Sequence, residues 1–376
     1  MRKISRRKFL SLFTQSAGAA AVFQLLEACG IKPAAAPGTA TSTPFGPLAS
    51  GVDNGISIAN APGSTNTPLP SDTLAPTAEA ATVTPSPTSD FAYLAVARGG
   101  DDPEALTRAA VAAIGGIGKF VPRGAKVLIK PNACVIHDYT YAATTNPWVV
   151  GALVKMCFEA GAGKVLVFDF PFGGTCAETY KASKIEEQAT AAGAQMEYVD
   201  TSKFVQTNLP NGHSLHSAKF YSEVVNADVV INVPIAKNHS TTWVTLGMKN
   251  LMGTIHDRGA IHSDVLDTMD QRIADLAMYI RPELTVVDAV RIMMKGGPQG
   301  TGLRNVVKLD TVIASADIVA VDAYATKLFA PLDPSNNFYK MILTDPNNLG
   351  YVKYGAEWGI GRSDLANLKI SEISVG

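Results

Sequence analysis

The sequence predicts an α/β fold, a layered domain in which helices flank a largely parallel sheet, preceded by a signal peptide and a disordered linker. Two observations predict it. Short apolar runs alternate with helical patterns from residue 91 onward, as in strands joined by helical crossovers. Residues 30–90 are instead rich in Pro, Thr, Ser, Ala and Gly, a composition that cannot bury enough apolar surface to offset chain entropy. We therefore expect a signal peptide at 1–28, a disordered tether at 29–90 and one α/β domain at 91–376.

The elements of the folded domain follow from periodicity and from cap signals. The predicted strands are 91–99, 125–130, 164–170, 227–234, 283–290 and 306–316. The predicted helices are 101–116, 147–162, 184–194 and 317–330. Three of the helices have start signals, because Pro103 and Pro147 fall in first turns and Asp317 stands at an N-cap position.

The first 28 residues have the layout of an export signal, with a basic head before an apolar stretch from Ser11 to Ala28. The segment "SRRKFL" at 5–10 resembles the twin-arginine consensus, and "LEAC" at 26–29 resembles a bacterial lipobox. We expect export by the twin-arginine route and anchoring to the outer face of the cell membrane by a lipid on Cys29. A Sec signal, an uncleaved anchor and ordinary cleavage are the alternatives.

The charge balance argues against a nucleic-acid partner. The 376 residues carry a formal net charge of -1. The leader has five basic residues against Glu27, so the rest of the chain carries -5. A nucleic-acid binder would usually have a basic stripe, and any positive charge in the folded domain is therefore a local feature.

Polar and charged residues follow four of the predicted strands. In open parallel sheets, ligands bind outside the carboxyl ends of the strands. Since burial opposes lone charges, the recurrence predicts one shared pocket. The alternative is that strand ends are simply where the chain reaches water. The residues concerned are Lys130, Asn132, Asp169, Lys237, Asn238, His239 and Asp288.

The stretch 236–253, "AKNHSTTWVTLGMKNLMG", contains no acidic residue and adds Lys249 and Asn250. Lysines act as point charges for phosphate or carboxylate, and asparagine amides add oriented donors. We expect a small anionic ligand at Lys130, Asn132, Lys237, Asn238, Lys249 and Asn250, with His239 as acid or base and Asp288 orienting it. Three unrelated surface lysines are the alternative.

A metal site is a second hypothesis. His239, His256 and His262 lie in one stretch, although their spacings match no standard metal motif. The candidate ligands for a divalent metal ion are Asp169, His239, His256 and Asp288. The twin-arginine route exports folded proteins, many of which load a cofactor first.

The segment "KGGPQGTG" at 295–302 is a glycine-rich loop. Gly296 and Gly297 allow positive φ and a close backbone approach to a ligand. The loop lacks the P-loop signature and the dinucleotide fingerprint, so it does not imply a nucleotide. A plain connection between two elements is the alternative.

Three cysteines lie in the folded domain. Cys157 falls in an apolar helical pattern and is expected in the core. Cys134 and Cys176 each follow a predicted strand end, so they form a disulfide after export, join His137 at a metal, or remain free thiols. No CxxC pair or ferredoxin-type run occurs, so the sequence indicates no iron–sulfur cluster.

Several stretches together resemble the family known as domain of unknown function 362. They include "VLIKPN", "ADVVINVPIAKNHSTTWVTLGMKNLMG", "GGPQGTG" and "ADIVAVDAYATKLF", and in order they cover nearly all of 91–376. The family has no established general activity. Many members carry an appended ferredoxin-like iron–sulfur segment, which implies a redox context, and this chain lacks it. The polar motifs of the family correspond to Lys130, Asn132, Lys237, His239, Lys249 and Asn250.

Three functions are therefore open. The first is an enzyme or sensor for a small molecule bearing phosphate or carboxylate. The second is a protein that binds a metal or a redox cofactor. The third is a non-catalytic surface lipoprotein that docks a protein partner.

Overall fold

The structure is a computed structural model that describes residues 91–262 and 265–376. The predicted signal peptide, the lipidation site at Cys29 and the tether lie outside these residues. None of the described helices combines the length and the apolar character that crossing a bilayer requires.

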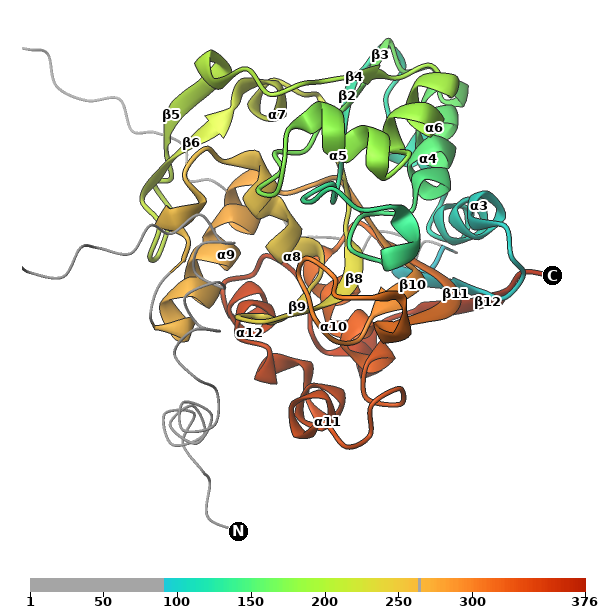
Figure 1. The fold of residues 1–376 in the computed structure, drawn as a ribbon, viewed down its shortest axis with the longest axis vertical. Coiled ribbons are helices and arrows are strands. Elements are labelled where there is room, and N and C mark those ends of the chain that lie inside the picture. The colour runs from blue at the N-terminus through green and yellow to red at the C-terminus, as the bar shows by residue number, and fades with distance from the viewer. Residues whose placement is uncertain (1–90, 263–264) are drawn as a thin grey trace, which may run out of the picture. The chain divides into compact units, whose positions relative to one another are not determined.

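A ten-stranded mixed sheet forms the centre of the domain, and a separate two-stranded sheet consists of β5 and β6. The main path of the large sheet has the order β12-β1-β11-β10-β7-β2-β3-β4, and β8 and β9 extend it beside β10 (Figure 1). The strands are β1 Leu94–Arg98, β2 Lys126–Pro131, β3 Lys164–Val167, β4 Gln195–Met196, β5 Phe204–Asn208, β6 Ser217–Tyr221, β7 Val229–Val233, β8 Ile235–His239, β9 Trp243–Thr245, β10 Leu284–Met293, β11 Val306–Ser315 and β12 Ile370–Ser374.

Helices cover both faces of the sheet. They are α3 Pro103–Ala113, α4 Pro147–Glu159, α5 Cys176–Ala182, α6 Ile185–Ala191, α7 Ser222–Val225, α8 Gly247–Asn250, α9 Leu266–Ile280, α10 Ile318–Ala325, α11 Asn337–Thr344 and α12 Gly350–Glu357. The α3, α4 and α6 helices pack into one apolar cluster, and α9, α10 and α12 pack into another. Consecutive residues of β10 alternate between them, with Val286 in the first cluster and Val287 in the second. This two-sided burial is why the strands are almost wholly apolar.

The predicted α/β class is confirmed, because β10, β7, β2, β3 and β4 run parallel to one another. All six predicted strands and all four predicted helices are present. The strand β11 differs, since it runs antiparallel to both β1 and β10. The reason is local: residues 294–305 join β10 to β11 without a helical crossover, and a short connection of this kind produces an antiparallel pair.

Local signals set the starts of the helices. Asn146 accepts a hydrogen bond from the Trp148 N–H and precedes Pro147 at the start of α4. Asp317 accepts from two backbone N–H groups at the start of α10. Both caps satisfy amides that a helix start leaves without intrahelical partners.

The strand β8 was not predicted separately, and it determines where the site lies. After β7 the chain passes Pro234 and then pairs with β10 and β9. This step carries Lys237 and His239 beyond the end of β7. The short helix α8 follows β9, and the Asp322 carboxylate of α10 holds it by accepting from the N–H groups of Gly247 and Met248.

Candidate functional site

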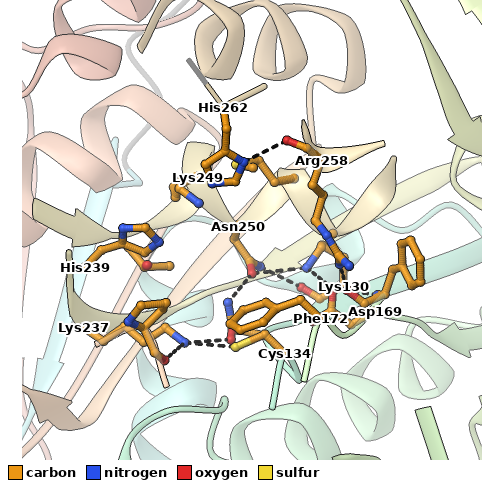
Figure 2. Close-up of a pocket in the computed structure, with 16 residues that line it drawn as sticks. Lys130, Cys134, Asp169, Phe172, Lys237, His239, Lys249, Asn250, Arg258 and His262 are labelled. Carbon is orange, nitrogen blue, oxygen red and sulfur yellow. Dashed lines mark hydrogen bonds and ion pairs between the residues drawn. The ribbon is translucent and has the colours of Figure 1, made fainter. Parts of the chain in front are cut away.

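A pocket lies where β2, β3 and β8 end and α8 begins (Figure 2). We call it the strand-end pocket. Its cavity volume is about 60 Å³, which leaves room for a small polar group rather than for a large ligand. Its polar lining residues are Lys130, Asn132, Cys134, Asp169, Lys237, His239, Thr245, Lys249, Asn250, Arg258 and His262.

Lys130 forms a buried ion pair at one side of the pocket. Its Nζ lies 2.6 Å from Asp169 Oδ1, and the two side chains are 1% and 2% exposed. Lys130 also donates to the Pro131 carbonyl at 2.8 Å, and Asp169 accepts from the Ala133 N–H at 2.6 Å. Burial lowers the pKa of Lys130, and the adjacent Asp169 carboxylate opposes that shift. The expected anion-binding charge of Lys130 is therefore compensated within the protein.

Gly253 makes room for this ion pair. A Cβ at position 253 would lie 2.1 Å from Asp169 Oδ1 and 2.9 Å from Lys130 Nζ. The glycine belongs to the turn Leu251–Thr254 that directly follows α8. A side chain there would overlap the carboxylate, so the pair depends on the glycine.

An amide network links the two sides of the pocket. Asn250 Oδ1 accepts from Lys130 Nζ at 3.2 Å and from Asn132 Nδ2 at 2.9 Å. Asn250 Nδ2 donates to Asn232 Oδ1 at 2.9 Å. Asn132 Oδ1 accepts from Lys237 Nζ at 3.1 Å. The amides of Asn132 and Asn250 thus bind neighbouring side chains and hold the two lysines in position.

Lys237 is as deeply buried as Lys130, at 1% exposure, but its partners are neutral. Its Nζ lies 2.6 Å from the Ala143 carbonyl, 3.0 Å from the Pro298 carbonyl and 3.2 Å from Cys134 Sγ, in addition to Asn132. Within the described chain, no carboxylate forms an ion pair with Lys237. Its positive charge is therefore available to an anion in the pocket.

Pro298 of the glycine-rich loop lines the pocket, whereas Gly296 and Gly297 of the same loop do not. Gly296 has a φ of 79°. The Gly297 N–H donates to Asn238 Oδ1 at 3.2 Å, and a Cβ at 297 would overlap the Asn238 carbonyl. The Asn238 amide also donates to the Trp243 carbonyl, so Asn238, Gly296 and Gly297 position the loop and do not line the pocket.

His239 and His262 both use Nδ1 for hydrogen bonds, but His239 Nδ1 accepts and His262 Nδ1 donates. His239 Nδ1 accepts from the N–H groups of Thr241 and Thr242 at 3.1 and 3.2 Å. His262 Nδ1 lies 2.9 Å from the Arg258 carbonyl, which can only accept, so this nitrogen carries the proton. Burial, followed by the charge of Lys249, lowers the pKa of both histidines, that of His239 well below its ordinary value. The neutral His239 ring consequently donates from Nε2, and the neutral His262 ring accepts at Nε2.

Asp288 does not orient His239, in contrast to the expectation from the sequence. Its two oxygens accept from the N–H groups of Asn146 and Val290 at 2.7 and 3.0 Å. Burial raises the pKa of Asp288 to about 7. The side chain is fully buried beneath the crossover from β7 to β8, where it binds backbone amides.

The four proposed metal ligands do not come together. Asp169 is paired with Lys130, and Asp288 binds backbone amides. His256 is exposed and packs its ring against Phe204, with centroids 5.0 Å apart. Among residues 91–262 and 265–376, no three His, Cys, Asp or Glu side chains form a group suited to a metal ion.

Cys134 and Cys176 are free thiols in the structure, so the predicted alternative of a disulfide between them is not observed. Cys134 Sγ accepts from Lys237, and Cys176 Sγ accepts from the Val199 N–H at 3.5 Å. His137 stacks on Tyr141 at 4.7 Å between ring centroids. Cys157 lies in the core, as predicted.

Among the lining residues that sequence reasoning did not place at the pocket are Arg258 and His262, although His262 was noted as one of three histidines in a single stretch. Both belong to the loop between α8 and α9, and neither follows a predicted strand. With them, the lining contains four cationic side chains and one carboxylate, Asp169. This excess of positive charge favours an anion over a cation in the pocket.

Comparison with known families matches residues 127–327 to the family described as Domain of unknown function (DUF362). The match covers more than half of the chain, which belongs to this family. The thylakoid-associated protein sll1697 of Synechocystis is 27% identical over 227 residues, which are 59% of this chain and 68% of that protein.

Two solved structures are similar at low identity. The lactate racemase apoprotein from Thermoanaerobacterium thermosaccharolyticum has a TM-score of 0.40 and 12% identity, over 57% of this chain and 53% of that chain. A structural-genomics protein from Thermotoga maritima has a TM-score of 0.33 and 11% identity, over 62% of this chain and 60% of that chain. The chain thus spans little more than half the length of either structure.

Proposed function

We propose that the strand-end pocket of this DUF362 protein binds a small molecule through a phosphate or carboxylate group, held chiefly by Lys237 and Lys249. One observation carries the proposal: Lys237 is 1% exposed, and within the part of the chain that the structure describes its hydrogen-bond partners are all neutral. A buried charge without a counter-charge is unfavourable. An anionic ligand would supply the missing negative charge.

The surroundings of Lys249 support the same conclusion. Lys249 is 8% exposed and its charge lowers the pKa of His239 and of His262, so it faces both rings (Figure 2). The two imidazoles beside this ammonium group are neutral, so neither ring adds a competing positive charge. The Nε2–H of His239 would add an oriented donor for the anion and is the group to test for proton transfer to a bound substrate.

The lining is less suited to a divalent metal ion. The cationic side chains of Lys237, Lys249 and Arg258 would repel a metal ion held in this space. An anionic cofactor or substrate is compatible with all three. We therefore rank the anion hypothesis above the metal hypothesis.

Calorimetric titration tests the proposal on the full chain. The probes are inorganic phosphate and acetate, with wild-type protein and the double variant Lys237→Met, Lys249→Met. We expect at least one probe to bind, and its affinity to fall roughly tenfold or more in the variant, because charge-assisted hydrogen bonds are lost.

The matched control is Lys155→Met, because Lys155 is exposed on α4 and pairs with Glu104 far from the pocket. This variant is expected to keep the wild-type affinity. Absence of binding by either probe, or equal affinity in the double variant, would contradict the proposal. Near-ultraviolet circular dichroism of each variant verifies that the fold is retained.

We further propose export by the twin-arginine route and anchoring to the outer face of the cell membrane through a lipid on Cys29. The supporting features are Arg6 and Arg7 in "SRRKFL" and the lipobox-like "LEAC". Cys29→Ser is expected to move the protein from the membrane fraction to the soluble fraction. Replacing Arg6 and Arg7 by lysine is expected to keep it in the cytoplasm. Unchanged fractionation of these variants would contradict the proposal.

A further inference from the structure

His262 contains a buried hydrogen-bonding atom that has no partner among residues 91–262 and 265–376. Its Nε2 is inaccessible to solvent, and none of these residues forms a hydrogen bond with it. Its Nδ1 lies 2.9 Å from the Arg258 carbonyl and must carry the ring proton, because a carbonyl oxygen only accepts. In the neutral ring, Nε2 is therefore an acceptor. Buried acceptors are normally paired, so this one indicates a donor that arrives with a ligand.

The other polar groups of the pocket are mostly donors. Lys249 and Arg258 face His262, and both of their charges lower the pKa of His262. His239 presents its Nε2–H to the same pocket, because its Nδ1 is occupied by two backbone N–H groups. The lining thus combines several donors suited to an anion with one acceptor that an anion cannot satisfy.

We propose, on the basis of the anion site proposed above, that the ligand is a small hydroxylated anion: its phosphate or carboxylate binds at Lys237 and Lys249, and its hydroxyl donates a hydrogen bond to His262 Nε2. The chemistry of the lining excludes the other common donor. An ammonium group on the ligand would be repelled by Lys249 and Arg258, whereas a neutral hydroxyl would not. His262 therefore selects among the anions that the lysines attract.

The proposal gives the two histidines different roles. His239 donates to the anionic group, and His262 accepts from the hydroxyl. The depressed pKa of His262 keeps its ring neutral at pH 7, which preserves the acceptor. Protonation of His262 would convert Nε2 to a donor and remove the selection for a hydroxyl.

Matched probes that differ only in their hydroxyl groups test the proposal. Glycolate and acetate form the carboxylate pair, and glycerol 3-phosphate and propyl phosphate differ at two hydroxyls in the phosphate series. Calorimetric affinities are measured for the full chain and for His262→Phe. In the wild type we expect the hydroxylated member of at least one pair to bind roughly tenfold tighter or more, because the deoxy probe leaves a buried acceptor unpaired. In His262→Phe the ratio is expected to approach one.

A pH series provides a second measurement that needs no variant. As the pH falls and His262 takes up a proton, the ratio between the affinities of glycolate and acetate, each corrected to the concentration of the ionised probe, should fall towards one in the wild type. Lys249, Arg258 and His239 are the charged and titratable groups that face His262, and they act on both probes alike. A ratio that is constant with pH and unchanged in His262→Phe would overturn the proposal.

The outcomes separate this inference from the proposed function. Equal binding of paired probes, together with weaker binding in Lys237→Met, Lys249→Met, would overturn the hydroxyl preference and leave the anion site standing. Failure of every probe to bind would overturn both. A preference that disappears in His262→Phe and at low pH supports both.

Discussion

Lys130 and Lys237 both line the strand-end pocket but have different electrostatic surroundings. Lys130 is the next-to-last residue of β2, Lys237 lies in the middle of β8, and both are 1% exposed. Lys130 has a carboxylate 2.6 Å from its Nζ, whereas Lys237 is surrounded by oxygen atoms of neutral groups and the sulfur of Cys134. Burial alone therefore does not distinguish a structural lysine from the lysine that we propose as ligand-binding, whereas the identity of the hydrogen-bond partners does.

This difference divides the strand-end pocket into two halves. The half at β2 and β3 has balanced charge, and its hydrogen bonds are satisfied by Asp169, Asn250 and backbone groups. The half at β8 and α8 contains Lys237, Lys249 and two neutral histidines. We assign stability to the first half and ligand binding to the second.

The largest expected effect on the free energy of unfolding comes from breaking the ion pair between Lys130 and Asp169. Asp169→Asn leaves Lys130 buried without a counter-charge, and we expect the free energy of unfolding to fall by about 3–5 kcal/mol. Urea unfolding measures it. The control is Glu104→Gln, which breaks the exposed pair with Lys155 and should change stability by about 0–1 kcal/mol. Equal effects of the two substitutions would show that the buried pair does not stabilise the fold.

Asp322 is a second buried carboxylate, but unlike Asp169 it forms no ion pair among the described residues. Asp322 is fully buried and accepts only from the backbone amides of Gly247 and Met248. Burial raises the pKa of Asp322 to about 7, from an ordinary value of 3.8. Between these values the folded state holds a proton that the unfolded state has lost, so stability falls as the pH rises towards 7.

Asp322→Asn removes this titration. Relative to the variant, the wild type should lose about 3 kcal/mol between pH 5 and pH 8, since one proton corresponds to about 1.4 kcal/mol per pH unit and the loss accumulates up to about pH 7. Urea unfolding of both proteins at the two pH values measures the change. Asp288→Asn should act in the same direction, because burial also raises the pKa of Asp288 to about 7. A difference between wild type and Asp322→Asn that is constant with pH would contradict the prediction.

A side chain at Gly253, beside the Lys130–Asp169 ion pair, is expected to have a smaller effect on the free energy of unfolding. Gly253→Ala places a Cβ 2.1 Å from Asp169 Oδ1, so the turn or the ion pair must shift. We expect a loss of about 1–3 kcal/mol, as for other overpacked sites. Gly118→Ala is the matched control, because nothing lies within 4 Å of a Cβ at that exposed position. Equal stability of the two variants would show that the pair does not need the space at Gly253.

Much of this arrangement is predictable from the sequence. Apolar runs followed by polar residues placed Lys130, Asp169, Lys237 and Asp288 at strand ends, because the periodicity of a buried strand is local. Asn132, Lys249 and Asn250 also line the pocket, as expected. The pairing of Lys130 with Asp169 was not predictable, because it depends on β2 and β3 being neighbours.

The remaining differences also have physical reasons. Asp288 follows an apolar run, but β10 continues to Met293 and buries this carboxylate inside the sheet. His262 lies in a loop, and no local pattern indicates which way a loop side chain points. The short strand β8 was not predicted, because the predicted strand ended at Pro234 and the polar residues Lys237, Asn238 and His239 do not resemble a buried strand.

The smallest expected effect on stability comes from a substitution in the half of the pocket at β8 and α8. Lys237→Met keeps the aliphatic stem, removes a buried charge and leaves no carboxylate without a partner. We expect it to lower the free energy of unfolding by about 1–2 kcal/mol, from lost hydrogen bonds to neutral groups. Lys130→Met is the matched comparison, and it should lower stability by about 3–5 kcal/mol because Asp169 then stays buried and unpaired. Urea unfolding of both variants measures the difference.

Urea unfolding in the presence of inorganic phosphate tests whether Lys237 binds an anion. A ligand that binds only the folded state stabilises it in proportion to the logarithm of its concentration above Kd. If Lys237 provides the charge for an anion, phosphate should stabilise the wild type and have little effect on Lys237→Met. A loss of stability in Lys237→Met as large as in Lys130→Met, with an undiminished response to phosphate, would mean that both lysines are structural. The division of the pocket into two halves would then be wrong.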